Sequence, residues 1–336
     1  MRPVVPAGPT TQAPKSLQDP SVLIAVLNWN RPQETIACLE SLIHLEFRRF
    51  AVLLVDNGSM PSTVEPILQW AATNAGGLRV VSQGNASELP PSEREFLLWQ
   101  NPTNLGYTGG NNVALNLALT WRFDWTLLLN NDGRLPPEYL RCLLATAGTQ
   151  PRAGIVGSRA VFPSDPTVRP YEGGRLMYEL GVHLLWRWRG RRGNVEVNFV
   201  PGNAALMRMR MLDEIGLLDE RYFLYTEDVE ISWRALRAGW RLLVNLDVAT
   251  EQGISTSLGG RRTAPYYYYV TRNTCLLISE ELTGPTRLLS MACFAGQSAV
   301  RCLIWAVSGK PRLVRAVAVG ARDFRCGRFG AAPGHL

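Results

Sequence analysis

The chain has 336 residues, of which 46% are hydrophobic and 19% charged, so it can form one large or two ordinary globular domains. Its net charge of +7 matches the excess of eight basic residues over one acid between residues 285 and 336. The rest of the chain is near neutral, so the charge gives no support for nucleic-acid binding by the main body, and we expect no nucleic-acid partner.

The six cysteines form no CxxC pair, and the three histidines are scattered along the chain. In a chain of this length, this pattern predicts free thiols in a reducing compartment. The N-terminal stretch has no apolar signal-peptide core. We therefore expect a cytoplasmic protein without a histidine-based metal site.

Residues 1–20 are rich in proline and polar side chains and are expected to be a disordered lead-in. Residues 22–27 and 51–55 are apolar runs that end in turn residues, as buried strands do. A helix beginning near Pro32 is expected after the first run, and a second helix after the other. Residues 78–81 predict a third, shorter strand.

Residues 83–103 predict a long polar connection that leads to a glycine-rich segment, residues 104–112, at the start of a helix. The next strand, residues 126–129, runs into Asn130-Asn131-Asp132-Gly133. Pro136-Pro137 then predicts another helix start. This alternation of strands and helices predicts a doubly wound, mostly parallel sheet.

The pattern changes after Ile155, where short strand-like runs and glycine-rich turns follow one another. A strand is expected over residues 195–200 and a helix over residues 206–215. The acids Glu227-Asp228 predict the first turn of a further helix that ends at Gly239. We then expect a strand over residues 240–246, followed by a helix over residues 266–282.

The basic tail has two interpretations. The apolar run at residues 288–300 is expected to be too short for a membrane span. Apolar residues interleaved with basic ones are typical of helices at the surface of an anionic membrane. The alternative is a pair of helices that pack on the main domain with a solvated basic face.

Asp56, Asn112, Asp132 and Asp228 each follow a predicted strand or begin a predicted helix. In a parallel sheet these positions lie near one edge, where ligands bind. A carboxylate there can hold Mg²⁺ or Mn²⁺ against phosphates, and a second can take a proton from a hydroxyl. The alternatives are an ordinary turn for Asp56 or Asp132 and helix capping for Glu227 and Asp228.

The order of the motifs resembles family 2 glycosyltransferases of the GT-A fold, in the bacterial rhamnosyltransferase-like branch. The matching segments are Val26-Leu27-Asn28-Trp29-Asn30-Arg31, Val55-Asp56-Asn57-Gly58-Ser59, Asn104-Leu105-Gly106-Tyr107-Thr108-Gly109-Gly110-Asn111-Asn112, Leu128-Leu129-Asn130-Asn131-Asp132, Pro201-Gly202-Asn203, Gly216-Leu217-Leu218-Asp219-Glu220, Tyr225-Thr226-Glu227-Asp228-Val229-Glu230, Arg272-Asn273 and Gly327-Arg328-Phe329-Gly330. The resemblance implies a Rossmann-like, mostly parallel sheet over residues 21–283, with a nucleotide half (21–133), an acceptor half (134–283) and a helical tail (284–336).

By this resemblance, Asp132 is the ligand of a divalent metal (Mg²⁺ or Mn²⁺) and Asp228 is the general base, with Glu227 beside it. The residues expected to bind the nucleotide-diphospho sugar are Asn30, Asp56, Asn104, Gly106, Gly109, Asn112 and Asn131. The chain departs from the family pattern by carrying amides at Asn130 and Asn131. It also has Glu251 where many relatives have a histidine.

The resemblance implies an inverting transferase that moves a sugar to a hydroxyl of a glycan or lipid-linked glycan of the cell envelope. Such an enzyme would be cytoplasmic or peripheral at the inner face of the membrane, which it would contact through the basic tail. The alternative is a non-catalytic partner subunit that binds sugar nucleotides, a role that the thinned metal motif favours.

Overall fold

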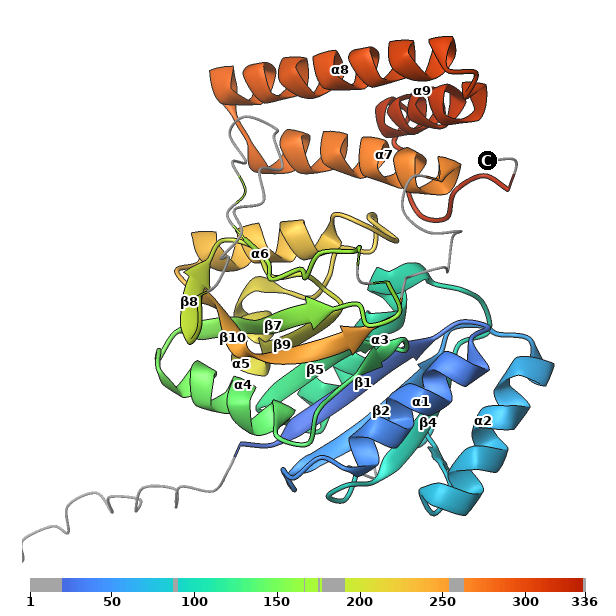
Figure 1. The fold of residues 1–336 in the computed structure, drawn as a ribbon, viewed down its shortest axis with the longest axis vertical. Helices are drawn as coiled ribbons and strands as arrows, with labels where there is room; N and C mark the ends of the chain where they lie inside the picture. Colours follow the sequence, from blue (N-terminus) through green and yellow to red (C-terminus); the bar gives the residue numbers. More distant parts are fainter. Residues whose placement is uncertain are drawn as a thin grey trace, which may run out of the picture.

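The computed structural model describes residues 20–334 except 87–89, 166, 175, 177–190 and 254–262. A central sheet lies between two layers of helices, and three C-terminal helices stack beyond α6 (Figure 1). The lead-in expected over residues 1–20 lies, apart from Pro20, outside the described residues.

The sheet follows the order β3-β4-β2-β1-β5-β9-β7-β10-β6, and β8 pairs with β10. The run from β3 to β5 is parallel, as is the pair β7 and β10, while β9 is antiparallel to both β5 and β7. The strands are β1 (Val22–Asn28), β2 (Phe50–Asp56), β3 (Arg79–Val80), β4 (Phe96–Gln100), β5 (Trp125–Asn130), β6 (Gly133–Arg134), β7 (Ala153–Val161), β8 (Asn194–Val197), β9 (Ala204–Arg208) and β10 (Arg241–Gln252). The predicted mostly parallel sheet is confirmed.

Two apolar cores lie on the two faces of the sheet. Helices α1, α2 and α4 contribute to one core, and α3, α5 and α6 contribute to the other. The helices are α1 (Pro32–Ile43), α2 (Pro61–Asn74), α3 (Gly106–Thr120), α4 (Tyr139–Gly148), α5 (Met209–Ile215), α6 (Glu227–Arg237), α7 (Ala264–Glu281), α8 (Gly284–Val307) and α9 (Pro311–Arg325). Burial on both faces explains why β1 and β2 are apolar up to their last residues, Asn28 and Asp56.

Two predictions about strands were wrong. Strand β4 lies inside the expected polar connection, because the short buried run Phe96, Leu97 and Leu98 pairs with β2. Part of the helix expected over residues 206–215 is strand β9, and α5 begins only at Met209. Pairing of β9 with β5 overrides the helical spacing of its apolar residues, since packing decides such short segments.

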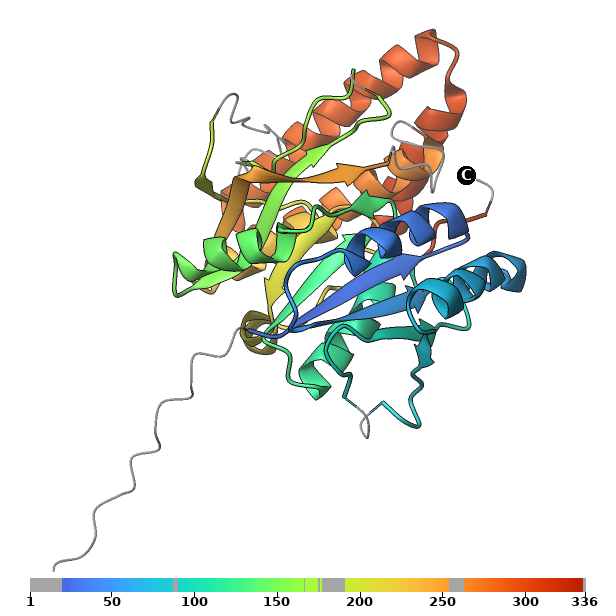
Figure 2. The same cartoon turned by 60° about the horizontal axis from the view of Figure 1, so that its bottom comes forward.

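The tail does form helices, as expected, but they differ from the prediction in length. Helix α8 has 24 residues, so by length and composition it can cross a membrane, and 11% of its apolar stretch is buried. The expectation that the apolar run at residues 288–300 is too short for a membrane span was therefore wrong, because the helix extends beyond this run at both ends. In both views α8 and α9 lie at the edge of the molecule remote from α2 (Figure 2).

Candidate active site

The ends of β1, β2 and β5 meet at one edge of the sheet. Asn28 of β1 pairs in register with Asp56 of β2, and Leu27 pairs with Asn130 of β5. The fully buried Asn28 side chain donates to Asp56 Oδ1 at 2.9 Å and accepts from Thr35 Oγ1 at 2.8 Å. Asn28 thus ties β1 to β2 and to α1, although it was not among the expected site residues.

Three of the expected donor-binding residues belong to this network. Asp56 also accepts from the Ser59 amide at 3.3 Å, and Asn131 Nδ2 donates to Thr35 Oγ1 at 2.9 Å. Asn30 adopts a left-handed backbone (φ 54°), and its Oδ1 accepts from the Met60 amide at 2.8 Å. The structure therefore brings these three side chains together at one edge, each with bonds inside the protein.

Asp132 lies in the turn between β5 and β6, beside the start of the segment that follows β10. The Gly253 amide donates to the Asp132 carbonyl at 2.9 Å. A Cβ at Gly253 would lie 3.1 Å from Asp132 Cβ, which explains the glycine. Burial raises the pKa of Asp132 to about 6.

Asp132 Oδ1 is buried and has no hydrogen-bond partner among the described residues. A buried acceptor without a partner is costly, and a hard cation is a partner that carboxylate oxygens suit. Asp132 therefore fits a divalent metal. Among the described residues, no three His, Cys, Asp and Glu side chains gather as a metal cluster.

Strand β10 ends beside this turn. Its residue Glu251 stands at the position where many relatives are expected to have a histidine. Glu251 pairs with Arg134 and is exposed, while the next residue, Gln252, is 5% exposed and pairs with Gly133. Gln252 Nε2 is buried without a partner in the described structure. Because successive strand residues face opposite sides, Gln252 is the β10 side chain that packs beneath the turn.

Glu227 and Asp228 form the first turn of α6. Asp228 Oδ2 accepts from the Gly202 amide at 3.2 Å, and its Oδ1 accepts from the Val229 amide at 2.9 Å. Glu227 is 6% exposed, and its Oε2 is buried with no partner among the described residues. Burial, and then the neighbouring Asp228 carboxylate, raise the pKa of Glu227 well above its ordinary value. Burial of this pair therefore favours the protonated form of Glu227.

The segment at Gly202 connects this acid pair to the turn that carries Asp132. The Asn130 amide donates to the Asn203 carbonyl at 3.0 Å, next to the Gly202 amide that binds Asp228. The Tyr107 hydroxyl donates to the Gly202 carbonyl at 2.5 Å. Burial, with the charges of Glu227 and Asp228, raises the pKa of Tyr107 well above its ordinary value, so it stays a donor.

The loop before α6 has an unusual backbone: Phe223, Tyr225 and Thr226 have positive φ values of 62°, 66° and 76°. The Tyr107 and Thr108 amides, at the start of α3, both donate to the Phe223 carbonyl at 2.6 and 3.3 Å. In this structure the N-terminus of α3 thus binds a protein carbonyl.

The expected glycines pack closely against this loop and against their own helix. A Cβ at Gly106 would lie 2.5 Å from the Phe223 carbonyl oxygen, and Gly106 has a φ of 74°. A Cβ at Gly109 would lie 2.8 Å from Leu105 Cβ. Both positions therefore need glycine for reasons of packing.

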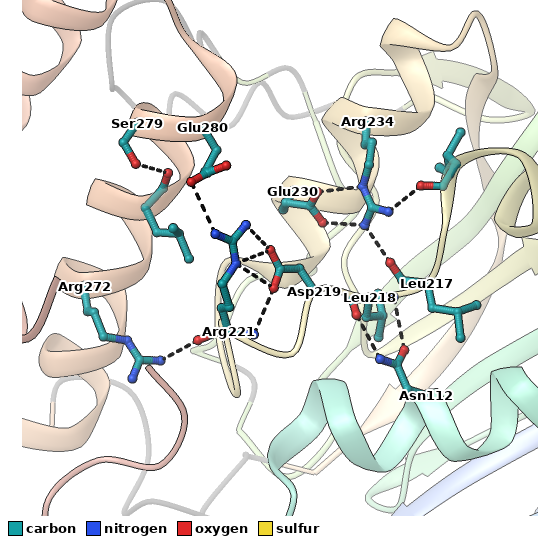
Figure 3. A network of polar contacts seen from close by, with 12 residues as sticks. Asn112, Leu217, Leu218, Asp219, Arg221, Glu230, Arg234, Arg272, Ser279 and Glu280 are labelled. Carbon is teal, nitrogen blue, oxygen red and sulfur yellow. Dashed lines mark hydrogen bonds and ion pairs between the residues drawn. The ribbon is translucent and has the colours of Figure 1, made fainter. Parts of the chain in front are cut away.

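Two amides from the same segment also have partners inside the protein. Asn104 Oδ1 accepts from Asn57 Nδ2 at 3.0 Å and from the Gly106 amide at 2.8 Å. Asn112 exchanges two hydrogen bonds with the backbone of Leu218, at 2.9 and 3.1 Å (Figure 3). Asn112 therefore holds the segment that leads towards α6.

The model of glycosyltransferase-like family 2 matches residues 20–263, which is most of the chain. The matched range contains the whole sheet and the candidate site residues at its edge. The chain therefore belongs to glycosyltransferase-like family 2 and is a glycosyltransferase.

Two relatives come from mycobacteria. The chain is 29% identical over 273 residues to an N-acetylglucosaminyl-diphospho-decaprenol L-rhamnosyltransferase of Mycobacterium tuberculosis, covering 73% of this chain and 80% of the relative. It is 29% identical over 153 residues to the galactofuranosyltransferase GlfT1 of the same species, covering 44% of this chain and 48% of that one. The expected rhamnosyltransferase-like branch is confirmed.

Solved structures show the same fold at low identity. The mannosyltransferase PcManGT from Pyrobaculum calidifontis, in complex with GDP-Man and Mn²⁺, has a TM-score of 0.55 and 14% identity, covering 96% of this chain and 91% of that one. S. aureus TarS 1-349 has a TM-score of 0.51 and 15% identity, covering 91% and 92%. The expected GT-A fold is confirmed.

The raised pKa of Glu227 predicts a pH-dependent stability difference. In the wild type, stability falls as the pH rises from the pKa of glutamate in the unfolded chain, about 4.3, towards the higher folded value. Glu227→Gln removes this loss, so its stability relative to wild type should rise by up to about 1.4 kcal/mol per pH unit. Urea unfolding at pH 5 and pH 8 measures the difference. The exposed residue Glu65 supplies the control variant, Glu65→Gln. If the stability of Glu227→Gln relative to wild type changes no more between pH 5 and pH 8 than that of the control, the raised pKa of Glu227 is contradicted.

Proposed function

We propose that the enzyme transfers a sugar, with inversion, from a nucleotide-diphospho sugar to a hydroxyl of a glycan or lipid-linked glycan. The observation that supports this most is the pairing of two sites through residues 201–203. Asp132, whose Oδ1 has no partner among the described residues, follows the end of β5, and the acid pair Glu227 and Asp228 begins α6. A transferase needs one carboxylate for the metal and another for proton removal.

We assign donor binding to residues 21–133 and acceptor binding to residues 134–283. Asp132 would hold Mg²⁺ or Mn²⁺, and the bound ion would offset the charge of the leaving diphosphate. PcManGT, which has the same fold, was solved with GDP-Man and Mn²⁺. The nucleotide would bind over the network of Asn30, Asp56 and Asn131. The residues that shape the rest of this donor surface are Asn104, Gly106, Gly109 and Asn112.

Asp228 would act as the general base. It takes the proton of the acceptor hydroxyl while the acceptor oxygen bonds to the anomeric carbon and the bond from that carbon to the diphosphate oxygen breaks. One displacement from the opposite face inverts the configuration. Burial raises the pKa of Glu227 and favours its protonated form, so the negative charge of the pair would lie on Asp228.

We infer the acceptor class from the name of a relative. One is named for transfer to N-acetylglucosaminyl-diphospho-decaprenol, a lipid-linked sugar. We therefore propose a polyprenyl-diphosphate-linked acceptor, reached from the cytoplasm at the inner face of the cell membrane. The six cysteines are free, as expected in a reducing compartment.

Helix α8 is the element that we propose contacts that membrane. It buries Ser290 and Phe294, and Trp305 packs on Tyr267 of α7 with ring centroids 4.4 Å apart. Its other face is exposed and carries large apolar side chains. The large exposed apolar residues are Leu288, Leu289, Val300, Leu303, Ile304 and Val307. One packed face and one apolar face favour a helix that lies in the interface over one that spans the bilayer.

The metal assignment predicts a loss of metal-dependent donor binding. Asp132→Asn keeps the size of the side chain and removes the charge that the cation needs. Calorimetry with a nucleotide-diphospho sugar should show that Mn²⁺ no longer strengthens binding in this variant. Asp165→Asn, in an exposed turn, is the control. An unchanged effect of Mn²⁺ in Asp132→Asn would move the metal elsewhere.

The base assignment predicts a loss of chemistry without a loss of donor binding. Asp228→Asn keeps a capping side chain, so α6 should still form. Transfer should fall by about two to four orders of magnitude, the usual range for loss of a general base. Donor affinity, measured by calorimetry, should stay close to that of wild type. Near-normal turnover in a folded variant would assign the base to Glu227, and next to Glu251.

The membrane assignment predicts a specific effect of charge on the apolar face of α8. Full-length protein should co-sediment with vesicles that contain anionic lipid. Leu303→Glu should weaken this binding by about tenfold or more, because a buried leucine contributes about 1.5–3 kcal/mol. Ser308→Glu, which adds the same charge just beyond the helix, is the control. Wild-type protein that ignores such vesicles would remove the membrane contact.

A further inference from the structure

A fully buried arginine lies next to the loop that carries the acid pair. Arg272 of α7 is 0% exposed, and each of its five N–H groups has an oxygen acceptor. The acceptors are Asn273 Oδ1 (3.0 Å), the Tyr268 hydroxyl (3.4 Å) and the carbonyls of Gly330 (2.7 Å), Arg221 (3.1 Å) and Tyr222 (2.9 Å). A guanidinium fixed in this way has one geometry, because its donors form a rigid fork.

Asn273 extends the same contact along the loop. Its Nδ2 donates to the carbonyls of Tyr222, Leu224 and Tyr225 at 2.9, 2.9 and 2.7 Å. The remaining carbonyl, that of Phe223, accepts from α3. Every carbonyl from residue 221 to residue 225 therefore has a donor from another element.

These hydrogen bonds stabilise a backbone conformation of residues 221–226 that is unfavourable for residues other than glycine. Phe223, Tyr225 and Thr226 are left-handed without being glycine, which persists only where the surroundings impose it. The loop runs directly into Glu227 and Asp228. Arg221 is held in addition by Asp219 and by Glu280 of α7, at 2.7 and 3.3 Å (Figure 3).

The C-terminal segment binds the far side of the same guanidinium. Gly330 supplies a carbonyl to Arg272, and the Phe329 ring centroid lies 5.8 Å from the guanidinium carbon. The Ala332 amide donates to the Tyr269 hydroxyl at 2.7 Å, and Tyr269 stacks on Phe223 with ring centroids 5.6 Å apart. Residues 329–332 thus reach the loop through one arginine and one tyrosine.

We propose that Arg272 and Asn273 are positioning residues for the acid pair, and that residues 329–332 complete this clamp, so that their docking sets the rate of transfer without contact with the donor. The proposal rests on the function proposed above for Asp228. A displacement of 1 Å in catalytic geometry can lower a rate by about 100-fold. Donor binding, which we place at the ends of β1, β2 and β5, should be spared.

A matched pair of truncations tests the clamp. A chain ending at Arg328 loses residues 329–332, while a control chain ending at Pro333 keeps them. The kcat of the first chain should fall at least about tenfold, because the acid pair is misplaced. Its donor affinity, measured by calorimetry, should stay within about twofold of that of the full-length chain. The control should match the full-length chain. A folded Arg328-terminated chain with normal kcat, or with kcat and donor affinity reduced together, would overturn the proposal.

Amide hydrogen exchange gives a readout that does not depend on activity. In the Arg328-terminated chain and in Arg272→Lys, which loses the fork, residues 221–228 should exchange faster while β1 and β2 stay protected. Arg237→Lys, an exposed arginine on α6, is the control. Unchanged exchange would overturn the clamp. Faster exchange, together with a full-length protein that transfers no sugar, would keep the clamp and reject the proposed function.

Discussion

The burial of one carboxylic acid beside another is the constraint on which the rest of the site depends. Glu227 lies inside the protein with an oxygen that has no partner in the described structure, next to Asp228. Such an arrangement costs free energy and lasts only where neighbouring elements fix it. Here α3 and α7 both hold the preceding loop, through the amide of Tyr107 and the side chains of Arg272 and Asn273.

The antiparallel strand β9 explains how two distant parts of the chain form one site. It inserts between β5 and β7 and starts directly after residues 201–203. This position lets Asn203 accept from Asn130 while Gly202 binds Asp228. A purely parallel sheet would not place the segment before a strand beside the end of its neighbour. The departure from parallel order therefore joins the end of β5, which leads to Asp132, to the start of α6, which carries Asp228.

The sequence predicted where the candidate side chains lie in the fold better than it predicted the bonds that they form. The apolar runs of β1, β2 and β5 and the acids of α6 were visible because they are local patterns. Strands β4 and β9 were missed, because pairing with distant strands decides such short segments. Gly106 was expected to bind the nucleotide-diphospho sugar, yet it packs against Phe223, a residue that is distant in sequence. The burial of Gln252 rather than Glu251 also depends on pairing with Gly133 and Arg134.

The most direct test of the whole account is the stereochemistry of transfer. Full-length protein is incubated with Mn²⁺, a panel of nucleotide-diphospho sugars and a prenyl-diphosphate-linked N-acetylglucosamine, and the product is analysed by NMR. The account predicts that one donor gives nucleotide release in step with a glycosylated acceptor, and that the new bond has the configuration opposite to that of the donor. Retention of configuration, or donor binding without transfer to any acceptor, would contradict it.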